Sequence, residues 1–232
     1  MKILALDTAL NACSVALVDT AGGNKPTSES VAMGRGHAEA LMPMVAHVVG
    51  AARLLFKDID RFAVTVGPGS FTGIRVGVAA ARGLSLATGR PLIGVTTLEA
   101  YASEVAEEGA GAPIAIALDA RRGEVYFQEF DAAGRPLGEA AALTPAAAAQ
   151  RLSQDAVLAG SGALLVAESL FQIGGTPRLR ELGPGPDPVV LARIAAERPV
   201  PERRPAPLYL RPADAKPQPG GLARAETGAA AP

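Results

Sequence analysis

The chain has 232 residues, of which 49% are hydrophobic and 19% are charged, and its formal net charge is −1. This composition is typical of a globular protein with one large domain or two small ones, and it excludes a disordered chain. The near-zero net charge also argues against a protein that binds nucleic acid without a partner. Any binding of nucleic acid would have to be shared with a basic partner.

The sequence offers no sign of export or of a membrane anchor. Its single cysteine, Cys13, cannot form an internal disulfide. The apolar start is short and reaches Asp7 too early for a secretory signal. No uninterrupted apolar run reaches the roughly 18 residues of a membrane span. We therefore expect a cytoplasmic protein.

The first half of the sequence alternates strand and helix patterns. Short strands are predicted at residues 3–6, 14–18 and 28–33, with a glycine-rich turn at 22–24. A long apolar helix is predicted over 37–55, in which Pro43 marks a kink or a staggered start. Strand 62–66, helix 72–87, strand 91–95 and helix 98–108 follow. Gly89 suits the end of the second helix.

The second half follows a similar plan after a linker at 109–113. Strand 114–118 ends at Asp119, as strand 3–6 ends at Asp7. Strand 125–130, helix 144–152, strand 157–159 and helix 188–197 complete the pattern. These echoes suggest a duplicated α/β unit, divided into residues 1–108 and 109–212. The tail at 213–232 is rich in Ala, Gly and Pro and is expected to be disordered.

Two turns carry the pattern of an anion site. Asp7 and Thr8 stand between two strands, where actin-like ATPases place a phosphate loop. Because the tip lacks a glycine, an ordinary hairpin with a capping aspartate is favoured there. Ser70 and Thr72 follow a Gly-Pro-Gly turn and open a helix, whose free N–H groups attract anions. The hydroxyls serve equally well as helix caps, and both interpretations stay open.

The helices at 37–55 and 72–87 are apolar on nearly every side. In the second, Gly73, Gly77 and Ala81 recur every four residues, which would let another backbone come close. Two such helices exceed what one face of a sheet covers. We therefore favour an exposed apolar patch that binds a partner, the alternative being two helices central to the core.

Other candidate sites are weaker. Asp119 and Glu124 could form an acid–base pair, but a solvated hairpin with Asp–Arg pairing is favoured. His37 and His47 lie ten residues apart, which does not place two metal ligands on one helix face. No metal site is expected.

Several segments together carry a family resemblance. They are ILALDTA at 3–9, SVAL at 14–17, GHAEALMPM at 36–44, VTVGPGSFTGIRVG at 64–77, LDARRGEVY at 118–126 and PLYLR at 207–211. On these segments the chain resembles the TsaB (YeaZ) family, over residues 1 to about 211. The GPGSFTGIR stretch is too long for a chance match.

The resemblance implies a two-lobed α/β fold with mixed sheets, of the actin/Hsp70-like (ASKHA, ribonuclease H-like) class. It also implies a non-catalytic subunit that binds the paralogue TsaD, with the ATPase TsaE, in forming threonylcarbamoyladenosine next to the anticodon of tRNAs reading ANN codons. The resemblance further implies that such a protein can form a homodimer when TsaD is absent and that it contacts tRNA only through the complex. It assigns no cofactor to this subunit, and it leaves open ATP binding at the level of the complex and weak nucleotide binding in the cleft. If His37 matches the first metal ligand of TsaD, the second falls on Leu41, which cannot bind a metal.

In the family, the pairing surface comes from the two N-terminal helices. On that basis the expected interface residues are His37, Leu41, Met44, Val45, Val48, Ile74, Val78, Arg82 and Leu86. Two rival functions remain. An independent ATP-dependent enzyme would need a competent phosphate loop, and a peptidase would need a metal pair or a nucleophile with its base.

Overall fold

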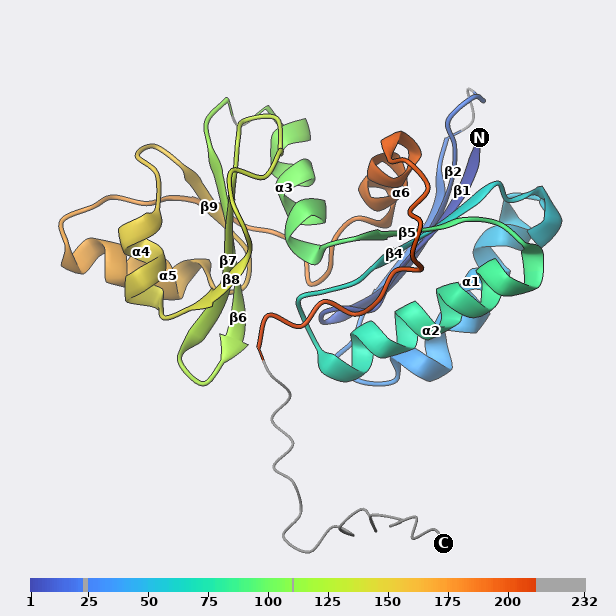
Figure 1. The fold of residues 1–232 in the computed structure, drawn as a ribbon, viewed down its shortest axis with the longest axis horizontal. Helices are drawn as coiled ribbons and strands as arrows, with labels where there is room; N and C mark the ends of the chain where they lie inside the picture. The colour runs from blue at the N-terminus through green and yellow to red at the C-terminus, as the bar shows by residue number, and fades with distance from the viewer. Residues whose placement is uncertain (23–24, 110, 212–232) are drawn as a thin grey trace, which may run out of the picture.

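The protein has two lobes, each built on a five-stranded sheet (Figure 1). The structure is a computed structural model and describes residues 1–22, 25–109 and 111–211. The tail expected to be disordered, at 213–232, lies outside the described residues, as do Gly23 and Asn24 of the expected turn. Among the described residues, no helix is both long enough and apolar enough to cross a membrane.

The first sheet has the strand order β3-β2-β1-β4-β5. Its strands are β1 (Lys2–Asp7), β2 (Ala12–Asp19), β3 (Thr27–Ala32), β4 (Arg61–Thr65) and β5 (Leu92–Val95). The first three strands pair antiparallel, while β1–β4 and β4–β5 pair parallel. Because β1 and β2 are buried along almost their whole length, they read as continuous apolar runs rather than alternating ones.

The second sheet repeats this order as β8-β7-β6-β9-β10. Its strands are β6 (Ile114–Arg121), β7 (Glu124–Phe130), β8 (Ala141–Leu143), β9 (Val157–Ala159) and β10 (Arg178–Arg180). The antiparallel and parallel pairings also recur in the same places. The duplicated α/β unit suggested by the sequence is therefore present. The fold class is the expected one, a two-lobed α/β protein with a mixed, ribonuclease H-like sheet in each lobe.

Helices cover both sheets. On the first, α1 (His37–Ala51) and α2 (Phe71–Thr88) lie side by side on one face, and α6 (Pro188–Glu197) covers the other. On the second sheet, α3 (Thr97–Glu107) packs between the lobes, while α4 (Pro145–Arg151) and α5 (Ala163–Gln172) cover the far side.

Two helices cross the proposed division at residue 108. Although α3 precedes that boundary, Leu98 and Tyr101 pack with Ile114 of the second lobe. Although α6 follows it, Leu191 packs with Ile3 of the first lobe. The two helices also contact one another at the centre of the molecule (Figure 1). Each sheet is built from one half of the chain, but α3 and α6 each pack on the sheet formed by the other half.

Most predicted elements are present, with shifted ends. The first helix ends at Ala51 instead of residue 55, because Arg53 adopts a positive φ of 53° and a short 3-10 turn, η1 (Phe56–Asp58), follows. α5, β8 and β10 were not predicted. β8 and β10 have only three residues each, too few to carry a periodic signal.

Candidate functional site

Asp7 lies at the end of β1, at the centre of the molecule, and is completely buried. Its Oδ1 accepts hydrogen bonds from the hydroxyl of Thr65 at 2.6 Å and from the backbone N–H of Ala9 at 3.1 Å. Its Oδ2 has no partner among the described residues. Burial raises the pKa of this carboxyl from 3.8 to about 6, against the lowering effect of the Thr65 and Ala9 hydrogen bonds.

The open side of Asp7 is closed by the loop at residues 181–187, which joins β10 to α6. A side chain at Gly185 would place its Cβ 3.0 Å from Oδ2 of Asp7. The loop is fixed by Asn11, whose N–H donates to Pro184 O at 3.0 Å, and by Tyr101, whose hydroxyl donates to Gly183 O at 2.8 Å. The unpaired carboxylate oxygen therefore faces protein backbone.

Glu104 of α3 holds the far end of the same loop. One of its carboxylate oxygens accepts the N–H of Asp187 at 2.6 Å. Burial, with a smaller contribution from the nearby charges of Asp187 and Asp7, raises the pKa of Glu104 from 4.5 to about 7, against the lowering effect of the Asp187 N–H hydrogen bond. Two carboxyl groups with raised pKa values thus lie where the lobes meet.

The loop after β1 packs directly on the start of α2. The hydroxyl of Thr8 donates to Gly73 O at 2.8 Å, and the N–H of Ser70 donates to Ala9 O at 2.7 Å. A Cβ at Gly73 would lie 2.0 Å from Thr8 O, and one at Gly77 would lie 2.5 Å from Thr8 Oγ1. The small residues at four-residue spacing do admit another backbone, which is this chain's own loop.

This packing decides what the candidate phosphate-loop residues can do. Asp7, Thr8 and Ser70 are brought together. However, the Thr8 hydroxyl already donates to Gly73 O, and the Ser70 N–H already donates to Ala9 O, so neither donor is available to a phosphate. The Ser70 hydroxyl accepts the N–H of Gly73 at 3.3 Å, which makes it the N-cap of α2. Thr72 is exposed and lines a separate hollow with His37. The cap interpretation is therefore confirmed for Ser70.

A small polar cleft separates the lobes. Its volume is about 200 Å³. Residues of the first lobe (Leu10, Asn11, Gly69, Ser70) face those of the second (Leu118, Asp119, Ala120, Arg121, Tyr126, Ser161). Asp119 pairs with Arg121 at 3.4 Å, and Glu124 pairs with Arg211 at 3.1 Å. The hairpin with Asp–Arg pairing is thus confirmed, and both candidate acid–base residues, Asp119 and Glu124, form an ion pair with an arginine.

The histidines are not brought together. His37 is buried at the start of α1, and its Nε2 lies 3.1 Å from Leu10 O. His47 is exposed and pairs with Glu29 at 2.7 Å. Within the described residues there is no group of three or more His, Cys, Asp or Glu side chains placed to hold a metal.

Most of the expected interface residues lie in the core of the first lobe. Six apolar ones pack against the first sheet and are 0–6% exposed: Leu41, Met44, Val45, Val48, Ile74 and Val78. His37 is also buried. Arg82 is half-buried, with its Nε donating to Pro205 O at 2.9 Å, and only Leu86 is well exposed, at 68%. The apolar positions face the sheet because a helix packed on a sheet turns its most apolar stripe inward.

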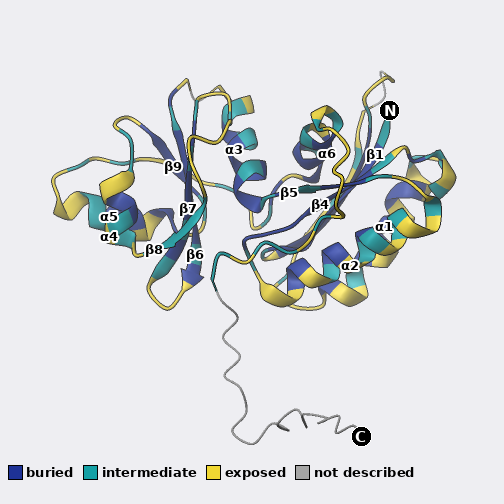
Figure 2. Cartoon of the chain, viewed as in Figure 1, coloured by how far each residue is buried: buried dark blue, intermediate teal, exposed yellow. Residues whose placement is uncertain are grey.

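The outward faces of α1 and α2 are exposed (Figure 2). The exposed apolar residues on these faces include Met42, Pro43, Ala46, Ala79, Gly83, Leu86 and Ala87. Val76, Ala80 and Leu84 are half-buried in the same apolar cluster as α1. The outward face is therefore low in relief and apolar, and α2 contains no acidic residue.

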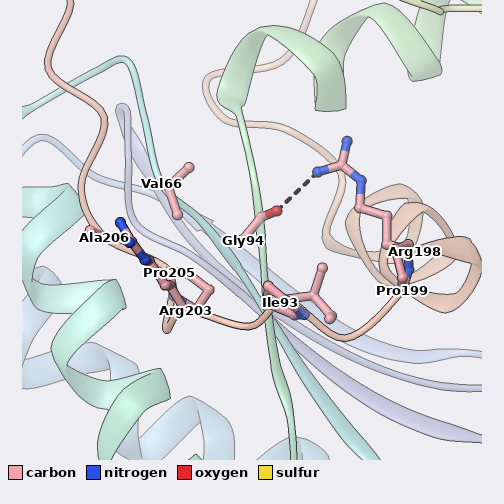
Figure 3. A pocket seen from close by; sticks show the side chains of 9 residues that line it. Val66, Ile93, Gly94, Arg198, Pro199, Arg203, Pro205 and Ala206 are labelled. Atoms are coloured by element: carbon pink, nitrogen blue, oxygen red, sulfur yellow. Dashed lines mark hydrogen bonds between the residues drawn. The ribbon is translucent and has the colours of Figure 1, made fainter.

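A second hollow lies under the C-terminal segment, beside the edge strand β5 (Figure 3). Its volume is about 360 Å³, and apolar side chains such as Val66, Ile93 and Pro205 line most of it. Arg198 also lines the hollow, and its guanidinium donates to Gly94 O at 2.9 Å and pairs with Glu99 at 2.6 Å. Sequence reasoning missed this hollow and the loop over Asp7, although Gly-Pro-Gly at 183–185 repeats the motif at 67–69.

The chain is similar to proteins of one family. Residues 14–164 match the family model described as TsaD: tRNA N6-adenosine threonylcarbamoyltransferase. The tRNA threonylcarbamoyladenosine biosynthesis protein TsaB of Escherichia coli is 39% identical over 130 residues, which are 56% of this chain and 55% of that protein. YeaZ from Pseudomonas aeruginosa is 30% identical, with a TM-score of 0.72 over 84% of this chain and 92% of that one. The chain belongs to the TsaB (YeaZ) family.

Other relatives extend the match over the whole fold. An uncharacterised protein of Mycobacterium tuberculosis is 34% identical over 219 residues, 93% of this chain and 94% of that protein. A Pseudomonas aeruginosa protein described as similar to the peptidase YeaZ has 30% identity and a TM-score of 0.75 over 90% of this chain and 99% of that one. The match to the Escherichia coli and Haemophilus influenzae TsaB proteins spans only about half the length of each.

Proposed function

We propose that this chain is a non-catalytic scaffold or activating subunit in the formation of threonylcarbamoyladenosine in tRNA. It would bind TsaD, with TsaE, and act on tRNAs that read ANN codons only as part of that complex. The observation that carries the proposal is membership of a family whose named relatives are tRNA threonylcarbamoyladenosine biosynthesis proteins. Division of the chain into two lobes at residue 108 belongs to the same proposal.

The proposed interface is the outward face of α1 and α2. It comprises Met42, Pro43, Ala46, Ala79, Gly83 and Leu86, all exposed. Small and apolar side chains suit the close packing of helices from two proteins, and burying them removes apolar surface from water. The same face would join two copies of this chain when TsaD is absent.

The junction of the lobes supports a non-catalytic role. The Thr8 hydroxyl and the Ser70 backbone N–H donate hydrogen bonds to carbonyl oxygens of this chain, and Gly185 lies against the unpaired oxygen of Asp7. A phosphate loop works by pointing such donors at the ligand. With these donors engaged inside the chain, binding of ATP belongs at the level of the complex. The rival functions, an independent ATP-dependent enzyme and a peptidase, gain no support from these contacts.

The proposal is tested by reconstituting tRNA modification with TsaD, TsaE and a source of threonylcarbamoyl-adenylate. Omitting this chain should abolish product. Ala79→Glu, which places a charge on the proposed interface, should lower the rate at least about tenfold, while Asp119→Asn in the cleft should leave it within about twofold. The reverse order of sensitivity, or ATP hydrolysis by the chain alone that Asp119→Asn abolishes, would indicate an enzyme with its own site.

A further inference from the structure

The C-terminal segment at 198–211 lies across the first lobe beside α2, as an extended strap (Figure 1). The N–H of Leu208 donates to Val66 O at 2.7 Å, and Arg82 holds Pro205 by its carbonyl. Together α2 and the strap carry a single acidic residue, Glu202, and six arginines: Arg75, Arg82, Arg198, Arg203, Arg204 and Arg211. A chain of net charge −1 therefore concentrates positive charge along one strip.

Two of the six arginines are neutralised inside the protein. Arg198 pairs with Glu99, and Arg211 pairs with Glu124. Among the described residues, the other four have no carboxylate within ion-pair distance: Arg75, Arg82, Arg203 and Arg204. Arg203 and Arg204 are exposed on the strap. Such a row of unneutralised guanidinium groups attracts anions and forms fork-shaped hydrogen bonds to phosphate.

Two aromatic rings flank this row. Phe71 of α2 is 47% exposed and Tyr209 of the strap is 44% exposed, with their ring centroids 5.3 Å apart. The guanidinium of Arg75 lies 3.7 Å from the Phe71 centroid, and its Nε donates to the Tyr209 hydroxyl at 2.9 Å. The three side chains thus present fixed flat surfaces to solvent. Nucleic-acid bases stack on aromatic rings and on arginine planes of this kind.

We propose that this strip binds a short single-stranded segment of RNA, with phosphates on Arg203, Arg204 and Arg82 and bases stacked on Phe71, Arg75 and Tyr209. The inference rests on the proposed function, which supplies an RNA as the substrate of the complex. A duplex would hide its base faces from the rings, and an acidic peptide would leave the rings without partners. Seven residues of extended chain, from 203 to 209, span at most about 25 Å, enough for a few nucleotides.

The hollow beneath the strap extends the same surface. Arg203 lines its rim, and Val66 and Ile93 form its apolar wall (Figure 3). A cavity of about 360 Å³ is within the range that takes small flat ligands. An unstacked base next to the phosphate held by Arg203 would have an apolar space to enter.

The charged half of the strip is tested with a fluorescein-labelled single-stranded RNA of ten nucleotides. Fluorescence anisotropy is recorded at several salt concentrations, for the chain alone and for its pair with TsaD. Arg203→Glu with Arg204→Glu should weaken binding at least about tenfold and make the log–log salt dependence shallower by about 1.4, as expected for two lost phosphate contacts. The matched control, Arg135→Glu with Arg151→Glu on the second lobe, changes the net charge equally and should stay within about twofold.

The stacking half is tested with Tyr209→Leu, which should weaken binding by about 5- to 100-fold and leave the salt dependence unchanged. Equal losses in the strap variant and its control, tighter binding of a duplex of the same length, or full competition by polyglutamate would each overturn the proposal. Light scattering on the same samples separates the two claims. Pairing with TsaD without this RNA binding refutes only the strip, and RNA binding through the strip without pairing refutes only the scaffold function.

Discussion

Close contact between the loop after β1 and α2 is set by single glycines. Gly73 and Gly77 stand where any side chain would meet Thr8, whereas Gly83, on the outward side of the same helix, has nothing within 4 Å of its would-be Cβ. The sequence revealed the spacing of the small residues. Their partner could not be predicted, because Thr8 is 65 residues from Gly73 in the chain.

This contrast gives a matched pair of substitutions. Gly73→Ala should lower the free energy of unfolding by roughly 1–3 kcal/mol, because the added methyl overlaps Thr8 O. Gly83→Ala should raise it by about 0.5–1 kcal/mol, since alanine favours a helix and meets no atom there. Urea unfolding followed by circular dichroism measures both. Equal effects of the two substitutions would contradict the contact.

The buried carboxyl of Asp7 makes stability depend on pH. Burial raises its folded-state pKa to about 6 from 3.8, so the folded protein holds the proton more tightly than the unfolded chain. Its stabilising contribution is fully present below pH 4 and is lost as the pH rises through 6.

Asp7→Asn should remove that dependence while keeping an oxygen acceptor for Thr65. Between pH 4 and pH 7 the free energy of unfolding of the wild type should fall by about 2 kcal/mol relative to the variant. Denaturation curves at intervals of half a pH unit test this. Parallel profiles for the two proteins would mean that Asp7 titrates normally.

Among the elements, the sequence located most helices and strands but not their orientation. α1 and α2 are apolar at so many positions that the sequence does not show which side of each helix packs on the sheet. The structure places Val45 and Val78 against the sheet and leaves Met42 and Ala79 outside. The choice depends on which strands lie beneath the helix, and strand order is set by pairings between residues distant in sequence.

The start of α3 is fixed by a capping box. Thr96 accepts the N–H of Glu99 at 3.0 Å, and Glu99 accepts the N–H of Thr96 at 2.9 Å while also pairing with Arg198. Thr96→Ala should therefore destabilise the protein by about 1 kcal/mol, and Thr96→Ser should cost much less because the hydroxyl remains. Thermal unfolding of both variants measures the difference. An alanine variant as stable as the serine one would rule out a stabilising cap.

At the scale of the whole molecule, duplication was visible in the sequence because both halves open with an apolar strand ending in aspartate. The exchange of covering helices was not visible. α6 buries Leu191 and Ala195 against the first sheet, although it follows all five strands of the second. Nothing in its own sequence distinguishes the two sheets.

The exchange predicts how fragments behave. Residues 1–108 alone would leave the α6 face of the first sheet and the apolar side of α3 uncovered, so this fragment should lack a cooperative unfolding transition. A chain that joins residues 1–96 to 186–211 through a flexible linker restores the α6 cover and should regain one. Cooperative unfolding of fragment 1–108, or its absence in the joined chain, would contradict the packing described here.

The most direct test of the central claim is the mass of the complex by size-exclusion chromatography with light scattering. We expect the wild-type chain to form a one-to-one complex with TsaD, and Ala79→Glu to abolish it while remaining folded. The Ala146→Glu variant carries the same change at an exposed position of α4, and it should form the complex with TsaD normally. Val78 is unsuitable for this test, since it is 2% exposed and a charge there would disrupt the core. A wild-type chain that stays monomeric beside TsaD, or an Ala79→Glu chain that pairs normally, would contradict a scaffold acting through α1 and α2.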